Sequence, residues 1–396
     1  MSYQSAIALA YTFVILVIIK YFIWAPRKHH TAPRRLRNVK ECLYLLKSST
    51  LKQRASPNQR LVIAFGIDNA FTTVDPIHAK RFVNQSKSLL RTQGDDWKML
   101  TQFASDWTKQ VVFVKLQTSC SFRLLPMVQA LVFHTVLRKF FPAISTPSDS
   151  EVEFITSRIN SLWIASKGIA CQDKTQLVYQ RKEFQSRLQS TFSPNKSQSG
   201  EENPLNILLP AYETLWRVVL RIFLEVQFLS EPQRVCEYAA QFEKFLLDPT
   251  RGKFEEETQI QDGLSVSIKG IVAEGLRLYP PTRRIYREID GEEVAVDVEY
   301  LHRDATNWGD DAMRFIPGRW ATLTTCDAGK RGYMPFGAGT FECPAKPEFG
   351  LFAIGIMVGV LVTKFANQFE LNGGDDLGPL ENVRDAYSEL ELRRKI

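Results

Sequence analysis

The longest apolar run of the sequence lies close to the N-terminus. Residues 6–24 carry a single charge, Lys20, and their length is close to the ~20 residues that a helix needs to cross a bilayer. Lys20 lies in the last quarter of this run beside Tyr21 and Trp24, so its stem can carry the charge to the membrane interface. We therefore predict a transmembrane helix over residues 6–24, within an anchor segment 1–26.

A basic segment without acidic residues follows this apolar run. It contains Arg27, Lys28, Arg34, Arg35, Arg37 and Lys40. The positive-inside rule then predicts a cytosolic body. A cleaved signal peptide is the alternative, but it would carry its positive charge before the apolar core and small residues after it. With Pro26 and Pro33 nearby, we interpret residues 27–60 as a stiff basic hinge.

Helical periodicity dominates the remainder of the chain. The helical patterns cover residues 76–90, 121–141, 151–166, 204–228 and 265–279. The apolar run 349–362 is too short to span a bilayer and predicts a buried core helix. Helix is therefore the main structure expected of the body, residues 61–396.

Three other segments depart from the helical pattern. Residues 60–73 begin like a short strand that breaks at Gly66, and residues 182–203 fill with Ser, Gln, Lys and Glu as a surface loop would. Residues 293–299 alternate apolar and acidic side chains, which predicts a half-buried strand. We expect only small sheets.

Composition narrows the class of protein. Of 396 residues, 44% are hydrophobic and 23% charged, which excludes a disordered, collagenous or many-span membrane chain. The net charge of +7 gathers partly in the basic segment, so we predict no nucleic-acid partner. Six cysteines without a C-x-x-C pair argue against a disulfide scaffold or zinc ribbon and favour a reducing compartment.

Candidate chemistry appears in residues 333–350, YMPFGAGTFECPAKPEFG. Gly337 and Gly339 permit a positive φ or a close approach to a flat ligand, and Cys343 precedes Pro344 and an apolar helix. A sulfur near a helix N-terminus is favoured as a thiolate, the form that a metal requires. A buried structural cysteine is the simpler alternative.

This segment resembles the haem-ligand loop of the cytochrome P450 monooxygenases, F-x-x-G-x-R-x-C-x-G. Phe336, Gly339 and Cys343 match it, whereas Phe341 stands in place of an arginine and Ala345 in place of a glycine. The Cys-Pro-Ala-Lys-Pro variant is similar to fungal members. The resemblance implies that haem b is held by Cys343 as the axial thiolate, with Phe336 and Gly339 beside it.

Companion motifs occur in the family's order. Residues 273–284, AEGLRLYPPTRR, resemble the E-x-x-R helix, in which Glu274 and Arg277 lie on one face. Arg319 falls on the third member of the family's Glu-Arg-Arg triad, and Arg287 on a position that contacts a haem propionate. His302, which opens a kinase-like His-Arg-Asp, lacks the kinase spacing to Asn307 and is interpreted as a structural residue.

A further motif lies in the long helical segment 204–228. Residues 210–214, PAYET, resemble the family's A/G-G-x-D/E-T motif, with Glu213 and Thr214 in register and Pro210 in place of Ala or Gly. Oxygen activation requires protons, and a hydroxyl beside a carboxylate can relay them through water. A mid-helix Thr can also bond back to a carbonyl and bend the helix. An ordinary polar helix face is the alternative.

The resemblance, strongest over residues 203–362, implies a mainly α, cytochrome P450-like haem-thiolate fold with small sheets, besides the transmembrane helix. We expect a monooxygenase on the endoplasmic reticulum membrane, reduced by NADPH-cytochrome P450 reductase. Its substrate would be an apolar terpenoid, polyketide or alkaloid of fungal secondary metabolism. Two alternatives stay open: a redox-neutral haem-thiolate isomerase or dehydratase, and a haem-free remnant.

Overall fold

The computed structural model describes residues 32–167, 174–192, 200–260, 263–366, 368–373, 377–384 and 386–395. The chain divides into two units, Met1–Pro33 and Arg34–Ile396, of which the second is the body described below. The predicted anchor, residues 6–24, lies outside the described residues. Within the described ranges, no helix combines the length and apolar character needed to cross a membrane.

Helices make up most of the body, as expected. Its α-helices are α2 (Val39–Ser48), α3 (Leu51–Phe65), α4 (Pro76–Leu90), α5 (Gly94–Thr118), α6 (Leu124–Phe140), α7 (Asp149–Lys167), α8 (Lys174–Phe192), α9 (Leu205–Leu224), α10 (Pro232–Leu247), α11 (Arg251–Glu255), α12 (Ile268–Leu278), α13 (Val298–Arg303), α14 (Ala305–Trp308), α15 (Thr325–Lys330) and α16 (Phe349–Phe365). Three short helices of other types are η1 (Glu225–Leu229), η2 (Pro317–Ala321) and η3 (Gly339–Phe341).

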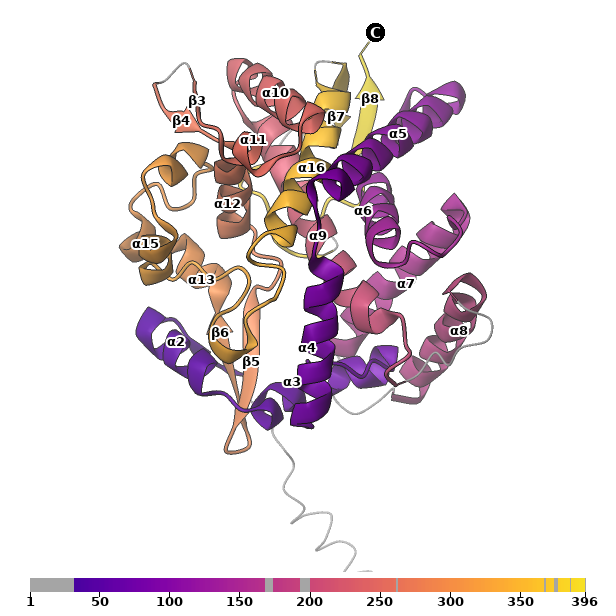
Figure 1. The fold of residues 1–396 in the computed structure, drawn as a ribbon, viewed down its shortest axis with the longest axis vertical. Helices are drawn as coiled ribbons and strands as arrows, with labels where there is room; N and C mark the ends of the chain where they lie inside the picture. Colours follow the sequence, from indigo (N-terminus) through magenta and orange to yellow (C-terminus); the bar gives the residue numbers. More distant parts are fainter. Residues whose placement is uncertain are drawn as a thin grey trace, which may run out of the picture. The chain divides into compact units, whose positions relative to one another are not determined.

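The strands form small sheets. They are β1 (Arg34–Leu36), β2 (Ser121–Arg123), β3 (Thr258–Gln259), β4 (Ser265–Val266), β5 (Arg284–Ile289), β6 (Glu292–Asp297), β7 (Phe369–Asn372) and β8 (Glu391–Arg394). The sheet orders are β1-β6-β5, β2-β8-β7 and β3-β4, with β1 parallel to β6 and β5 antiparallel to it. Figure 1 shows β5 and β6 with α2 on one side and the helices α6 to α8 on the other.

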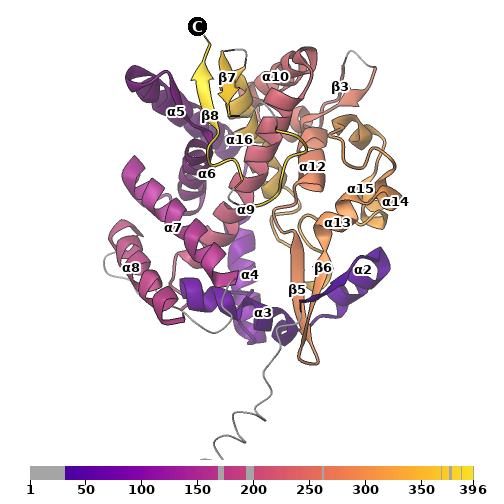
Figure 2. The same ribbon diagram turned by 180° about the vertical axis from the view of Figure 1, so that it is seen from behind.

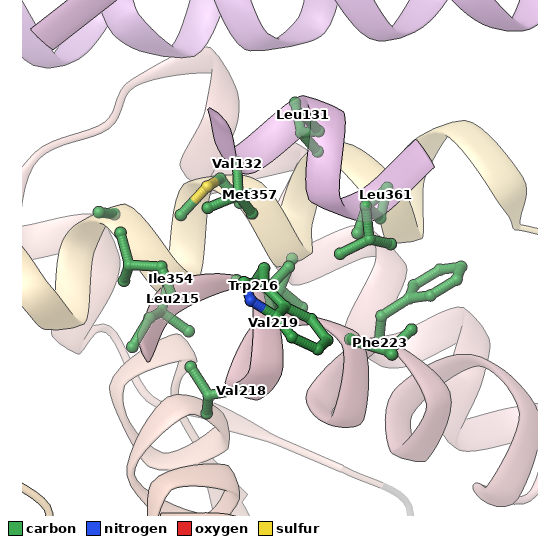
Figure 3. Packing of buried hydrophobic residues seen from close by; sticks show 14 of the residues in the cluster. Leu131, Val132, Leu215, Trp216, Val218, Val219, Phe223, Ile354, Met357 and Leu361 are labelled. Carbon is green, nitrogen blue, oxygen red and sulfur yellow. The ribbon is translucent and has the colours of Figure 1, made fainter. Parts of the chain in front are cut away.

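Helix α9 occupies the middle of the body. It packs against α6, α12 and α16, and Figure 2 shows it with α6 on one side and α12 on the other. Trp216 and Val219 of α9 lie close to Met357 and Leu361 of α16 (Figure 3), and all four are fully buried. Burial of large apolar side chains stabilises by ~1.5–3 kcal/mol each, so these contacts fix α9 relative to α16.

Several predicted elements are confirmed within a few residues. Segment 76–90 is α4, 151–166 lies in α7, 204–228 forms α9 and η1, and 349–362 lies in α16. The predicted strand at 293–299 is β6, which gives way to α13 at Val298.

Two local predictions were wrong because a few buried positions decide the structure. Residues 60–65 are the end of α3, since Leu61, Ala64 and Phe65 are buried at helical spacing. Residues 182–192 belong to α8 instead of a loop, because Phe184 and Leu188 are buried one turn apart among polar neighbours.

The predicted hinge also needs correction. Residues 34–60 contain β1, α2 and most of α3, and they group with the body. The reason is packing: Cys42, Leu45 and Leu46 of α2 are buried in one apolar cluster with Val294 and Val296 of β6. The body therefore begins at Arg34, and a hinge can extend no further than residue 33.

Candidate functional site

The loop before α16 carries the candidate ligand Cys343. The Cys343 amide donates to the Phe336 carbonyl at 2.9 Å, which closes the loop on itself. The Phe336 ring lies against Gly350, where an added Cβ would come within 2.8 Å of Cε1. Phe336 thus fastens the loop to the first turn of α16.

Gly337 and Gly339 both adopt positive φ, at 73° and 72°. A Cβ on Gly339 would lie 2.7 Å from the Leu46 carbonyl oxygen and 2.9 Å from the Lys47 Cα, both backbone atoms at the end of α2. A Cβ on Gly337 would meet only Ile285, at 3.7 Å. Gly339, which we predicted beside a cofactor, is therefore required so that the loop can approach the backbone of α2 closely.

Cys343 combines exposure with low hydration. The residue as a whole is exposed, yet loss of hydration raises the pKa of its thiol, opposed by the Ala345 amide and by Arg54. Burial of the sulfur therefore opposes the thiolate form that a position near a helix N-terminus is expected to favour.

Glu274 and Arg277 of α12 form a fully buried pair, as the i, i+3 spacing predicts. Arg277 donates through Nε and Nη2 to the two carboxylate oxygens of Glu274, at 2.9 and 2.8 Å. Its remaining N–H groups donate to the carbonyls of His302 at 2.8 Å, Ala312 at 2.6 Å and Arg314 at 3.1 Å. All five donors of this guanidinium are therefore satisfied.

The Glu274 carboxylate also binds the segment that follows α14. Arg319 donates through Nε to Oε1 at 3.0 Å, and Trp320 donates through Nε1 to Oε2 at 2.9 Å. The Ile316 amide donates to Oε1 at 2.9 Å. The structure thus brings together Glu274, Arg277 and Arg319, the three residues predicted as a triad.

His302 connects this network to the cysteine loop. The Met334 amide donates to its Nε2 at 2.9 Å, so Nδ1 carries the proton toward the Arg277 carbonyl, 3.0 Å away. Complete burial lowers the pKa of His302 to about 3, and the ring is neutral. The structural role predicted for His302 is confirmed, and its partner is the start of the loop.

Arg287 lies on β5 near the loop. It is 4% exposed, donates through Nη1 to the Tyr286 carbonyl at 2.8 Å, and finds no partner for Nε among the described residues. Its guanidinium carbon lies 5.6 Å from the centre of the Phe341 ring. A second arginine, Arg54 of α3, lies 4.6 Å from the same ring.

Sequence reasoning missed Arg54. It is 8% exposed and close enough to both Arg287 and Cys343 for their charges to interact. Arg54 belongs to the first half of the chain and fits no motif, so no sequence signal connects it to the loop. Only the packing of α3 against β5 brings it there.

The predicted oxygen-activation motif lies in the middle of α9. Pro210 has no amide hydrogen, so the Asn206 carbonyl loses its helical donor; Asn69 replaces it, donating through Nδ2 at 3.2 Å. Thr214 donates through Oγ1 to the Pro210 carbonyl at 2.9 Å, the back-bonding that we expected. Ile207, Pro210, Ala211 and Thr214 form a half-buried stripe along this otherwise buried helix.

Glu213 is oriented differently from its predicted partner Thr214. Its carboxylate forms a buried ion pair with Arg384, a residue of the C-terminal segment, and within the described ranges its Oε1 has no hydrogen-bond partner. The Arg384 guanidinium in turn lies over the Trp163 ring, 4.7 Å from its centre. Glu213 is thus held by Arg384, and it is not paired with the Thr214 hydroxyl.

The site can now be compared with known proteins. The family model described as Cytochrome P450 matches residues 268–376, the region that contains the triad, His302 and the Cys343 loop. Over these residues the chain is similar to the cytochrome P450 family. The match begins later than the predicted residue 203, and the motif of α9 lies outside it.

Individual relatives match only a limited part of the chain. Putative cytochrome P450 CYP13A4 of Caenorhabditis elegans is 40% identical over 86 residues, 18% of this chain and 16% of the relative. Cytokinin hydroxylase of Arabidopsis thaliana is 31% identical over 112 residues, 25% of this chain and 21% of the relative. The chain therefore spans only about a fifth of the length of such curated relatives in these alignments.

Solved structures extend the likeness to most of the chain. CYP175A1 of Thermus thermophilus superposes with a TM-score of 0.64 at 14% identity, covering 91% of this chain and 89% of that one. A six-coordinated cytochrome P450 of Thermus thermophilus gives 0.57 at 15% identity, with 84% of each chain covered. These likenesses establish a cytochrome P450 fold, as predicted.

Proposed function

We propose that this chain binds haem b through the Cys343 thiolate and inserts one oxygen atom from O2 into an apolar small molecule. Bound haem would supply the redox-active iron for oxygen activation. The observation that carries the proposal is the exposed residue Cys343 on a loop held by the buried Glu274–Arg277–His302 network. Among the described residues, the buried Arg54 and Arg287 have no carboxylate partner, so they would also fit the acidic edge of haem.

The chain's own residues have separate tasks in this proposal. Cys343 must lose its proton to bind iron, and the Ala345 amide and Arg54 both favour that loss. Phe336 and Gly339 hold the loop against α16 and α2. Glu274, Arg277 and Arg319 form the buried network that supports the loop, because His302 connects Arg277 to Met334 at the start of the loop.

On α9, the half-buried stripe that ends at Thr214 is our candidate for the face toward the reaction. Thr214 would hold a water or transfer a proton through its hydroxyl, whose hydrogen points to the Pro210 carbonyl and whose oxygen remains able to accept. Glu213 would act through its unpartnered Oε1.

The test is an absorption spectrum of the full chain, supplied with haem, reduced and treated with carbon monoxide. We expect the red-shifted Soret band of thiolate-ligated haem. Cys343→Ser should abolish this band, whereas Cys326→Ser, at another exposed cysteine, should retain it. A variant at residue 343 that keeps the red-shifted band would refute the assignment of the ligand, and a colourless folded protein would support the haem-free remnant.

A redox-neutral isomerase or dehydratase is the second candidate, and the Glu213–Arg384 pair favours it. A carboxylate held by a buried arginine is a poorer proton carrier than a free one, and redox-neutral chemistry requires no relay to oxygen. For the monooxygenase, Thr214→Ala should uncouple electron consumption from product while sparing haem. A normal thiolate band together with turnover that needs no reductase would select the redox-neutral candidate.

The cellular setting is also part of the proposal. An anchor at residues 6–24 would place the body on the cytosolic face of the endoplasmic reticulum, where NADPH-cytochrome P450 reductase supplies electrons. Asn84, exposed on α4, opens the sequon Asn84-Gln85-Ser86. It should stay unglycosylated in cells, as judged by a glycosidase mobility shift, and a glycosylated Asn84 would contradict a cytosolic body.

For the substrate, we propose an apolar terpenoid, polyketide or alkaloid of fungal secondary metabolism. The motif likeness to fungal members supports this, whereas the relatives named above come from a nematode and a plant. Binding-shift spectra of the holoprotein with apolar compounds would test it, and a preference for highly polar ligands would contradict it.

A further inference from the structure

Two buried arginines near Cys343 share an uncompensated positive charge. Arg54 and Arg287 are 8% and 4% exposed. Loss of hydration, and for Arg54 also the charge of Arg287, lowers each pKa to about 10, so both are cationic at neutral pH. Among the residues that the structure describes, no ion pair reaches either guanidinium.

Their hydrogen-bond donors are mostly unused. Arg287 uses Nη1 on the Tyr286 carbonyl but leaves Nε unpartnered. In the described part of the chain, the Arg54 side chain makes no hydrogen bond. It lies between aromatic neighbours instead, with its guanidinium carbon 4.5 Å from the Phe71 ring centre and 4.6 Å from that of Phe341. Aromatic rings attract a cation, yet they neither neutralise it nor accept its in-plane N–H groups.

Such a pair is costly unless an anion binds it. A buried donor without an acceptor loses its hydration without compensation, and two like charges repel. The missing partner should therefore be anionic, carry more than one oxygen acceptor, and reach the surroundings of the Cys343 thiol, with which Arg54 interacts. Haem meets these requirements, because it bears two carboxylates on one edge and an iron that binds thiolate.

We propose that Arg54 binds a haem propionate beside Arg287, supplying from α3 the positive charge that the cysteine loop lacks at Phe341. Phe341 then supports the two guanidiniums through its ring face, since both lie over it. This inference rests on the proposed haem function but assigns a new residue to it. Arg54 is a binding residue for the cofactor, with no part in the chemistry at iron.

The experiment compares haem with its dimethyl ester, in which both carboxylates are blocked. The full-length chain is titrated with each compound, and binding is followed by the Soret band and by the rate of haem transfer to excess apomyoglobin. Wild-type protein should prefer haem over the ester by at least about tenfold, because charge-assisted hydrogen bonds are lost on esterification. Arg54→Met should weaken haem binding by about tenfold or more and leave ester binding unchanged.

A matched control lies on the same helix. Arg60 of α3 donates through Nη1 to Ser166 at 2.7 Å and contacts Trp163 instead of Phe341. Arg60→Met should therefore leave the affinities for haem and for the ester unchanged. If Arg54→Met does not fold, Arg54→Lys takes its place in the test. Lysine keeps the charge without the planar guanidinium, so we expect a smaller loss of haem affinity and again no change in the affinity for the ester.

The outcomes separate this inference from the function on which it rests. If wild-type protein binds neither compound, the haem function and the role of Arg54 both fail. If wild-type protein gives the thiolate band but Arg54→Met binds haem normally, or weakens haem and ester equally, only the role of Arg54 is refuted. A loss specific to the free carboxylates supports it.

Discussion

The cysteine-loop side of the site and the α9 side differ in how completely their polar groups are satisfied. On the loop side, Arg277 uses all five donors and Glu274 accepts from four residues. On the α9 side, Pro210 removes a helical donor and Glu213 keeps an unpartnered oxygen beside Arg384. The polar groups that support the proposed ligand loop are thus more fully hydrogen-bonded than those around the residues proposed to transfer protons.

The largest effect should come from the loop side. Glu274→Gln removes the buried charge that neutralises Arg277, and we expect a loss of ~3–5 kcal/mol in the free energy of unfolding. Chemical denaturation of the purified body measures it. Glu256→Gln, at the exposed Lys253–Glu256 pair, is the control and should change little. Equal effects of the two variants would remove the distinction between a buried network and a surface pair.

A smaller effect is expected from the α9 side. Glu213→Leu leaves Arg384 buried without its carboxylate and should cost ~3 kcal/mol. Adding Arg384→Met removes the remaining charge, so the double variant should be more stable than Glu213→Leu alone. Denaturation of the single and double variants gives the coupling energy. A double variant that loses the full sum of both single effects would mean that the pair is not coupled.

The two loop glycines provide a matched comparison. Gly339→Ala forces a Cβ against the α2 backbone at positive φ, and we expect a loss of ~2–3 kcal/mol. Gly337→Ala meets the same unfavourable φ with only an ordinary contact to Ile285 and should cost ~1 kcal/mol. Thermal unfolding of both variants tests the difference. Equal losses would show that backbone conformation alone, and not contact with Leu46, requires Gly339.

The smallest expected difference between the two sides is in how the free energy of unfolding depends on pH. His302 has its pKa lowered from 6.5 to about 3 in the folded protein, so its contribution is lost as pH falls below 6.5. Glu225, which follows α9, has its pKa raised from 4.5 to about 7 mainly by burial, so its contribution is lost as pH rises from 4.5 to 7. Between pH 4.5 and 6.5 the two contributions oppose each other.

Glu225→Gln should reveal the His302 contribution. In this variant, stability should rise with pH between 4.5 and 6.5 by up to ~1.4 kcal/mol per unit, whereas the wild-type protein should change less. Urea denaturation at several pH values measures both slopes. A variant as flat as the wild type would contradict a neutral, buried His302.

Local spacing allowed part of this site to be predicted from the sequence. Glu274 and Arg277 are three residues apart on one helix, so their contact follows from helix geometry, and the family resemblance placed Arg319 and Cys343. Contacts between distant segments were not predictable. Arg54 reaches the Cys343 loop, and Arg384 reaches Glu213, only after the body has folded, and neither arginine lies at a spacing that indicates its partner.

The same reasoning applies to the fold. Strongly periodic segments such as α4 and α16 were predicted almost to the residue. Helix α8 was not, because polar composition concealed two buried positions, Phe184 and Leu188. The structure of α2 depends on burial against β6, whereas its sequence, seen alone, continues a basic segment.

The bond from Asn69 to the Asn206 carbonyl gives the central helix an external support. Because Pro210 cannot donate there, the Asn206 carbonyl of α9 depends on a side chain that is remote in sequence. Replacing Asn69 should therefore destabilise α9 as a substitution within the helix would. Suppressors of such a lesion would be expected at Pro210, where a residue with an amide hydrogen restores the helix from within.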